Sequence, residues 1–165
     1  GVLMVLNALK SRLSVDNLAI EKGLEEFSLA GRFQMLTEGT QTILDVAHNS
    51  QSAKMLVHNL KQFPSSGKTH IIIGMLKDKD RNSVLGELIE IADYWHTVTI
   101  SNPRGTDSQT IKNELLELGV KVPISENDAV ADVFVKIQNE TGMHDRIVVT
   151  GSFLTVGEAI KHLGI

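Results

Sequence analysis

Residues 70–75 read His-Ile-Ile-Ile-Gly-Met, and this short apolar run is the segment that decides the fold. A run of strand length without polar alternation is typical of a parallel strand that helices cover on both faces. Strands are also predicted at 95–100 and 146–150, and segments of helical periodicity lie between them. This alternation predicts an α/β domain with a doubly wound sheet.

The remaining elements complete a three-layer, Rossmann-like domain whose mostly parallel sheet has about six strands. Segments 32–36 and 41–46, joined by a turn at Thr37-Glu38-Gly39, are predicted to form an antiparallel first pair. A further strand is predicted at 120–124. Helices are predicted at 50–62, 81–92, 108–118, 127–139 and 153–163.

Residues 1–28 precede this alternation and are predicted to be helical, so we divide the chain into 1–28 and 29–165. Residues 2–13 are rich in Leu, Val and Ala. Ser14 or Asp16 could cap a second helix. Its apolar face would be formed by Ile20, Leu24 and Phe27.

The composition is that of a globular domain and excludes several classes of function. The 165 residues are 42% hydrophobic and 22% charged, with a net charge of −4 and no basic stretch, which argues against a nucleic-acid surface. There is no cysteine, so disulfides and thiolate metal sites are excluded. No apolar run approaches a membrane span, and the apolar start lacks the basic region of a signal peptide. We therefore expect a cytoplasmic location, and we expect this chain, which lacks an initiator Met, to be part of a larger protein.

The segment Asp45-Val46-Ala47-His48-Asn49-Ser50 ends a predicted strand and opens a helix. In α/β sheets, ligands bind outside the carboxyl ends of the strands. A carboxylate there suits ribose hydroxyls, and a His beside a helix N-terminus could donate to a phosphate or carboxylate. Asn49 or Ser50 could instead cap the helix, so a ligand site and a capping turn fit these residues equally well.

Three other segments have a structural interpretation, and two of them also have a functional one. Arg32 could stack on an adenine or pair with an anion, although a surface Arg on an edge strand is the simpler interpretation. Residues 77–80 favour a solvated loop in which Asp80 caps the next helix. Ser152 precedes the last helix, where it could be an ordinary N-cap or part of an anion site.

Motifs for catalysis and metal binding are missing from the sequence. It has no G-x-x-x-x-G-K-[ST] phosphate loop, no recommended nucleophile–His arrangement and no metal-like His spacing. From the residues alone, this is a ligand-facing α/β domain without phosphate-transfer machinery.

Four segments in order resemble the C-terminal domain of the folate branch of the Mur ligase superfamily, the folylpolyglutamate and dihydrofolate synthases. They are Ala30-Gly31-Arg32-Phe33-Gln34, Asp45-Val46-Ala47-His48-Asn49, Gly74-Met75-Leu76-Lys77-Asp78-Lys79-Asp80 and Thr150-Gly151-Ser152-Phe153-Leu154-Thr155-Val156. Asn102-Pro103-Arg104 is similar to a short loop of the same family. The muramyl ligases usually have Tyr where this chain has Val46, which favours the folate branch.

The resemblance implies an ATP-dependent ligase that joins L-glutamate to folate or dihydropteroate through an acyl phosphate. It implies ATP contacts at Arg32, Asp45, His48 and Asn49. His48 and Ser152 are implied to lie near glutamate and phosphate, and no catalytic residue is certain. The Mg²⁺ ligands are implied to lie in a central ATPase domain that these 165 residues lack, so the expected metal ligands here are none.

Residues 1–28 are implied to be the tail of that central domain, and residues 29–165 the C-terminal domain packed against it in a monomer. The fragment is then expected to be inactive alone. Three departures blur the subtype: Ala30, Ser50 and Leu154 each replace a residue common in the family. The alternatives are a stand-alone α/β binding module and a domain of another Mur-type ligase.

Overall fold

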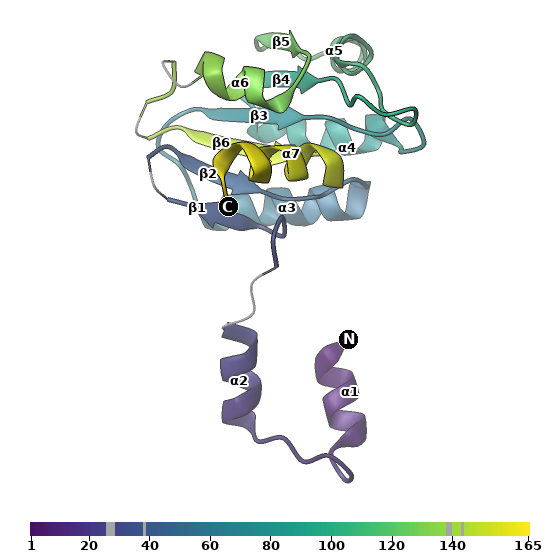
Figure 1. The fold of residues 1–165 in the computed structure, drawn as a ribbon, viewed down its shortest axis with the longest axis vertical. Coiled ribbons are helices and arrows are strands. Elements are labelled where there is room, and N and C mark those ends of the chain that lie inside the picture. Colours follow the sequence, from purple (N-terminus) through teal and green to yellow (C-terminus); the bar gives the residue numbers. More distant parts are fainter. Residues whose placement is uncertain (26–28, 38, 138–139, 143) are drawn as a thin grey trace.

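The protein folds around a six-stranded sheet that lies between two layers of helices, as predicted (Figure 1). The computed structural model describes residues 1–25, 29–37, 39–137, 140–142 and 144–165. The strand order is β1-β2-β6-β3-β4-β5. β1 and β2 pair antiparallel, which confirms the predicted first pair, and the other four strand pairings among the described residues are parallel.

The strands are short, and the central ones are fully buried. β3 and β6 lie at the centre, and every residue of both is buried, as their apolar sequences predict. The bounds are β1 Gln34–Leu36, β2 Gln41–Leu44, β3 Thr69–Ile73, β4 Tyr94–Val98, β5 Ile124–Asn127 and β6 Arg146–Thr150.

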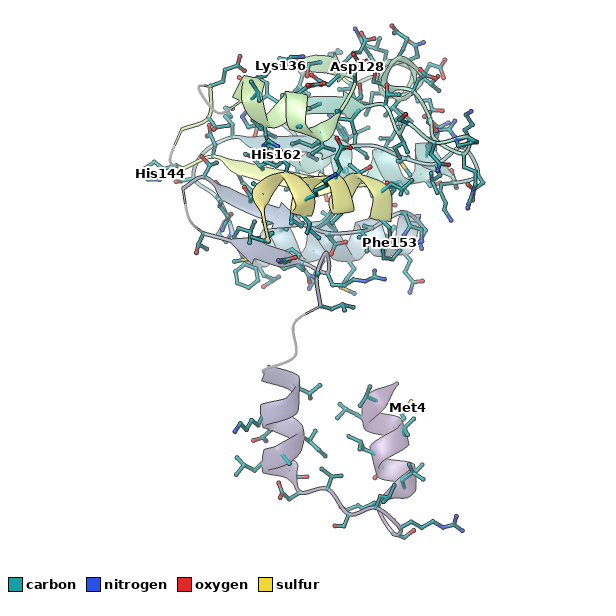
Figure 2. The ribbon with its side chains drawn as sticks, in the orientation of Figure 1. Met4, Asp128, Lys136, His144, Phe153 and His162 are labelled. Carbon is teal, nitrogen blue, oxygen red and sulfur yellow. The ribbon has the colours of Figure 1, made fainter. Side chains whose placement is uncertain are left out.

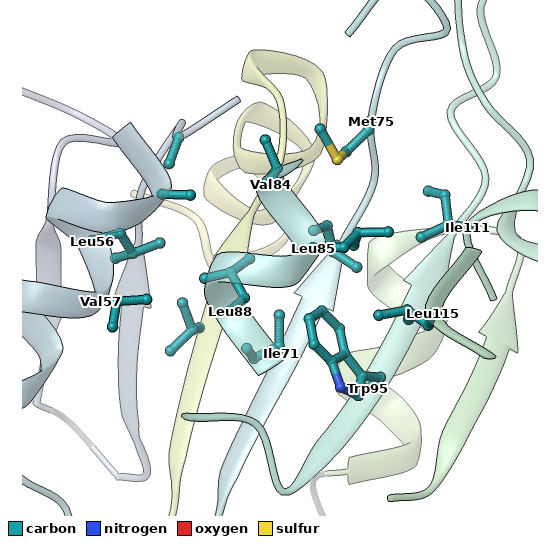
Figure 3. Packing of buried hydrophobic residues seen from close by; sticks show 14 of the residues in the cluster. Leu56, Val57, Ile71, Met75, Val84, Leu85, Leu88, Trp95, Ile111 and Leu115 are labelled. Atoms are coloured by element: carbon teal, nitrogen blue, oxygen red, sulfur yellow. The ribbon is translucent and has the colours of Figure 1, made fainter. Parts of the chain in front are cut away.

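The helices cover both faces of the sheet. α3, α4 and α5 pack on one face with Trp95, and α6 and α7 pack on the other. Figure 3 shows Trp95 between Ile71 of β3 and Leu115 of α5. The bounds are α1 Val2–Leu9, α2 Asn17–Glu25, α3 Ser50–Gln62, α4 Arg81–Leu88, α5 Ser108–Glu117, α6 Val130–Ile137 and α7 Phe153–Leu163, with a 3₁₀ turn at Ile89–Ile91 after α4.

The position of β5 is the main correction to the sequence prediction. The strand runs from Ile124 to Asn127 rather than over 120–124, because Pro123 has no N–H to donate and uses its carbonyl to accept from Trp95 N at 2.9 Å. Val120 stays buried in the core as a loop residue. An edge strand can be polar, so Ser125 and Asn127 complete the sheet without an apolar run.

Several helix boundaries also differ from their predictions. α6 begins at Val130 rather than 127, because Asn127 belongs to the strand and Glu158 of α7 accepts from Val130 N at 3.0 Å. The prediction for residues 138 and 139 lies outside the described residues. α4 ends at Leu88 rather than 92, where the chain tightens into the 3₁₀ turn.

The N-terminal helices lie apart from the three layers (Figure 1). α1 ends at Leu9, short of the predicted 13, and contains no buried residue. Met4 on this helix is 77% exposed (Figure 2). Asp16 rather than Ser14 caps α2, accepting from Ala19 N at 2.6 Å, and Phe27 lies outside the described residues.

A chain of buried and half-buried polar side chains crosses β3, β4 and β5 on the α6 face. His70 Nδ1 lies 3.1 Å from His96 Nε2, and His96 Nδ1 lies 2.8 Å from Ser125 Oγ. Asn127 donates to the same Ser125 Oγ at 3.1 Å. Burial lowers the pKa of His96 to about 4, with help from the positive charges of His70 and Lys136. The His96 imidazole is therefore neutral at pH 7.

Candidate functional site

Three loops meet at the carboxyl ends of β2, β6 and β3, where the sequence analysis placed its candidate residues. Hydrogen bonds tie the loops directly to one another. Gly151 N donates to Ala47 O at 3.0 Å, and Thr155 Oγ1 donates to Gly74 O at 2.9 Å. This edge is therefore a single surface formed by residues far apart in the sequence.

Asp45 holds the turn that carries Arg32. Its Oδ2 accepts from Phe33 N and its Oδ1 accepts from Ala47 N, both at 2.8 Å. Phe33 has a φ of 45°, an uncommon conformation for a residue with a bulky side chain. Burial raises the pKa of Asp45, while the two N–H donors and the charge of Arg32 act in the opposite direction. The carboxylate therefore has a structural task that the sequence pattern did not reveal.

A hollow of about 460 Å³ opens beside Asp45. Its apolar lining comes from Phe33, Met55 and Leu56, and its polar lining from Arg32, Asp45, Asn49, Gln51, Ser52 and Asn59. Arg32 is exposed and lies in the bend before β1, not on the predicted edge strand. An apolar wall beside a cation and a carboxylate suits a planar base carrying hydroxyls and phosphates.

Asn49 and His48 occupy the turn into α3. Asn49 is the N-cap, accepting from Ser52 N at 2.9 Å, and Ser52 Oγ reaches back to Asn49 N to complete a capping box. His48 Nδ1 lies 2.8 Å from Val46 O, and since a carbonyl only accepts, Nδ1 carries a proton. The neutral ring then leaves Nε2 as an acceptor, so His48 can donate to an anion through Nε2 only when it is doubly protonated.

Ser152 is the buried N-cap of α7. Its Oγ accepts from Thr155 N at 3.0 Å and lies 2.7 Å from Thr155 Oγ1. The Thr155 proton goes to Gly74 O, so the Ser152 proton goes to Thr155 Oγ1. The Ser152 hydroxyl thus has no spare proton for a ligand, and any contact from this residue would come from its backbone at the helix N-terminus.

The close approach of Gly74 and Gly151 explains why the loops that follow β3 and β6 can lie in contact. A Cβ on Gly74 would lie 2.6 Å from Thr155 Oγ1, and a Cβ on Gly151 would lie 2.6 Å from Gly74 O. Gly151 also has a φ of 101°, a backbone conformation that residues other than glycine rarely adopt.

Phe153, the first residue of α7, is a site residue that the sequence reasoning missed. It is 61% exposed at the start of α7 (Figure 2). Its ring lies 5.5 Å from the Arg32 guanidinium carbon and 6.0 Å from the His48 ring, measured to the ring centroid. It also lines a second hollow, of about 160 Å³, with His48, Leu76, Lys79 and residues 151–154. Phe153 lies inside the matched segment 150–156, directly after Ser152, and this position was the available signal.

A fourth loop, which follows β4, is joined to the loop that follows β3. Arg104 Nη2 donates to both carboxylate oxygens of Asp78 at 3.0 Å, and Lys77 N donates to Arg104 O at 2.8 Å. Leu76 and Gly105 form an isolated antiparallel bridge. Asp80 caps α4 by accepting from Ser83 N at 3.2 Å, as predicted. The loop of residues 74–81 is therefore held by its contacts with residues 104–105 and by the Asp80 cap of α4.

The described residues contain no group of three or more His, Cys, Asp or Glu side chains placed to hold a metal ion. Among the same residues, no helix is long and apolar enough to cross a membrane.

These features define a doubly wound α/β domain with adjoining nucleotide-sized and anion-sized hollows at the carboxyl ends of its strands. More specifically, the chain belongs to the family "Mur ligase, glutamate ligase domain", whose model matches residues 31–153.

The chain is similar to proteins described as dihydrofolate synthase/folylpolyglutamate synthase. The dihydrofolate synthase/folylpolyglutamate synthase of Escherichia coli K12 is 34% identical over 152 residues, which cover 92% of this chain and 34% of that protein. The structure of E. coli FolC in complex with ADP superposes with a TM-score of 0.85 at 33% identity, covering 96% of this chain and 38% of that one. A bifunctional folylpolyglutamate synthase/dihydrofolate synthase with Mn, AMPPNP and L-glutamate bound gives 0.82 at 34% identity, with coverages of 94% and 36%. The chain thus spans about a third of the length of the proteins that it matches.

Proposed function

We propose that this chain is the nucleotide- and glutamate-facing domain of an ATP-dependent folate ligase. The reaction would add L-glutamate to folate, to dihydropteroate or to both through an acyl phosphate. One observation carries the proposal: the nucleotide-sized hollow with Arg32 and Asp45 adjoins the smaller hollow with His48 and the α7 N-terminus. A site that joins ATP chemistry to an amino-acid substrate needs two such places side by side.

ATP is the cofactor that we assign to the larger hollow, on its apolar wall and its polar rim. Arg32 would bind the nucleotide, and Asp45 would position Arg32 through the Phe33 turn while retaining lone pairs for a hydroxyl donor. Asn49 would contribute from the rim, and His48 from the boundary of the two hollows. Mg²⁺ would be held by residues outside this chain.

The helices α1 and α2 would belong to the tail of a central ATPase domain. Their exposed apolar side chains support a buried position in a longer protein, notably Val2, Leu3, Met4 and Val5. In this proposal residues 29–165 pack against that domain, the protein acts as a cytoplasmic monomer, and closure over the site excludes water from the acyl phosphate.

The isolated 165-residue chain is expected to show no ligase activity, because the sequence contains no phosphate-binding loop of the G-x-x-x-x-G-K-[ST] type. The measurement is ATP-dependent incorporation of labelled L-glutamate into folate and dihydropteroate. The E. coli relative serves as the positive control. Incorporation by the isolated chain above background would contradict this division of labour.

Arg32→Ala in the full-length protein is expected to raise KM for ATP about tenfold, because a charge-assisted contact to the nucleotide is lost. Since Arg32 is exposed, the free energy of unfolding should change by less than about 0.5 kcal/mol. Lys61→Ala is the matched control, an exposed cation on α3 that pairs with Glu90 at 2.8 Å. Equal KM values for Arg32→Ala and Lys61→Ala would refute the nucleotide assignment.

The second candidate is a stand-alone binding module that kept this fold and lost the chemistry. The capping roles of Asn49 and Ser152 favour it, since both residues have purely structural partners. The reading frame upstream of residue 1 distinguishes the two functions. A phosphate-loop domain there supports the ligase, and a start codon near residue 1 supports the module.

A further inference from the structure

We infer that Phe153 is a positioning residue that presents the Arg32 guanidinium to the nucleotide; this inference rests on the proposed function. The ring is the first side chain of α7 and lies at the boundary of the two hollows. Neither core cluster contains it, and it is 61% exposed, so the packing of the domain does not account for an aromatic residue here.

The geometry of the Arg32–Phe153 contact is that of a cation over an aromatic face. The guanidinium carbon lies 5.5 Å from the ring centroid, within the range of an attractive cation–π interaction. Within the described part of the chain, no hydrogen bond or ion pair of the Arg32 side chain is found. The ring face and the charge of Asp45 are therefore what holds a long, exposed side chain in one place.

The position of the ring relative to Asp45 gives it a defined effect. Asp45 fixes the backbone of the Arg32 turn through Phe33 N, whereas Phe153 fixes the far end of the Arg32 side chain. A side chain held at both ends loses less conformational freedom when a ligand binds, and affinity rises accordingly. The 6.0 Å contact of the same ring with His48 sets the boundary with the second hollow.

The test is a double-mutant cycle in the full-length protein with AMPPNP as the probe, using Arg32→Ala, Phe153→Ala and the double variant. Phe153→Ala alone is expected to weaken AMPPNP binding about two- to fivefold, the range of one exposed cation–π contact. Phe153→Tyr should restore it. In the Arg32→Ala background, Phe153→Ala should have no further effect, whereas in a His48→Ala background its full effect should remain.

The outcomes separate this inference from the proposed function. If Arg32→Ala leaves AMPPNP affinity unchanged, the nucleotide assignment itself fails. If Arg32→Ala weakens binding but Phe153→Ala does not, only the inference fails. It also fails if Phe153→Ala costs as much without Arg32 as with it, because the ring then contacts the ligand directly. Thermal unfolding of Phe153→Ala should match the parent, and Phe153→Leu replaces it in the cycle if it does not.

Discussion

Replacing Asp45 with asparagine is expected to destabilise the domain by about 3 kcal/mol, although the two side chains have the same shape. Phe33 N and Ala47 N donate to the two different oxygens of the carboxylate, so both positions must accept. Asparagine has one acceptor oxygen, and its NH₂ group would face an N–H donor. Leaving a half-buried N–H without a partner costs about 1–3 kcal/mol, and the strained Phe33 turn adds to the loss.

The measurement is urea unfolding, with the midpoint falling and the slope unchanged. Asp80→Asn is the matched control, because Asp80 also accepts a backbone N–H, from Ser83, but at an exposed helix N-cap where asparagine serves equally well. It should cost less than about 1 kcal/mol. Equal losses for the two variants would show that Asp45 is not a two-acceptor anchor.

Lowering the pH from 7.5 towards 4 is expected to destabilise the domain by about 3 kcal/mol through His96. The pKa of His96 is about 4 in the folded chain, against an ordinary value of 6.5 for histidine. Between these values the unfolded state binds the proton and the folded state does not, so stability falls as pH falls through this window and is fully present above it. Burial also lowers the pKa of His70 and acts in the same direction, although Asp145, Glu140 and Asp93 oppose it.

His96→Gln removes the titrating group while keeping hydrogen-bonding atoms in the chain that joins His70 to Ser125. Urea unfolding at pH 7.5 and at pH 5 should therefore show a smaller loss for this variant than for the parent. His58→Gln, an exposed histidine on α3, is the control and should leave the loss unchanged. If His96→Gln and the parent lose the same stability, His96 does not titrate in this window.

The fold was predictable from the sequence because its central strands depend on local pattern alone. The apolar runs of β3 and β6 and the periodicity of α3 and α7 located these elements, although β3 ends at Ile73 rather than at the predicted Met75. β5 was misplaced because its stability comes from pairing with β4 and from buried polar contacts of Ser125 and Asn127, and none of these leaves a hydrophobic pattern. The short α1 likewise has no buried face to extend it.

The site was less predictable than the fold, because a motif identifies residues but not the hydrogen-bond partner of each side-chain atom. The sequence could not show that the Ser152 hydroxyl is hydrogen-bonded to Thr155, or that one oxygen of Asp45 accepts from Phe33 N. Both hydrogen bonds depend on the three-dimensional structure and leave no pattern in the sequence. Phe153 escaped notice for the same reason, since its importance lies in its distance from Arg32.

The junction between Asp78 and Arg104 has a consequence for how this edge would respond to a ligand. A loop anchored by an ion pair and a backbone bridge has already lost conformational freedom during folding. Ligand capture would then demand little rearrangement of residues 74–81, and the association rate would be governed by access to the edge rather than by loop ordering. Any larger rearrangement on binding would then occur outside residues 74–81.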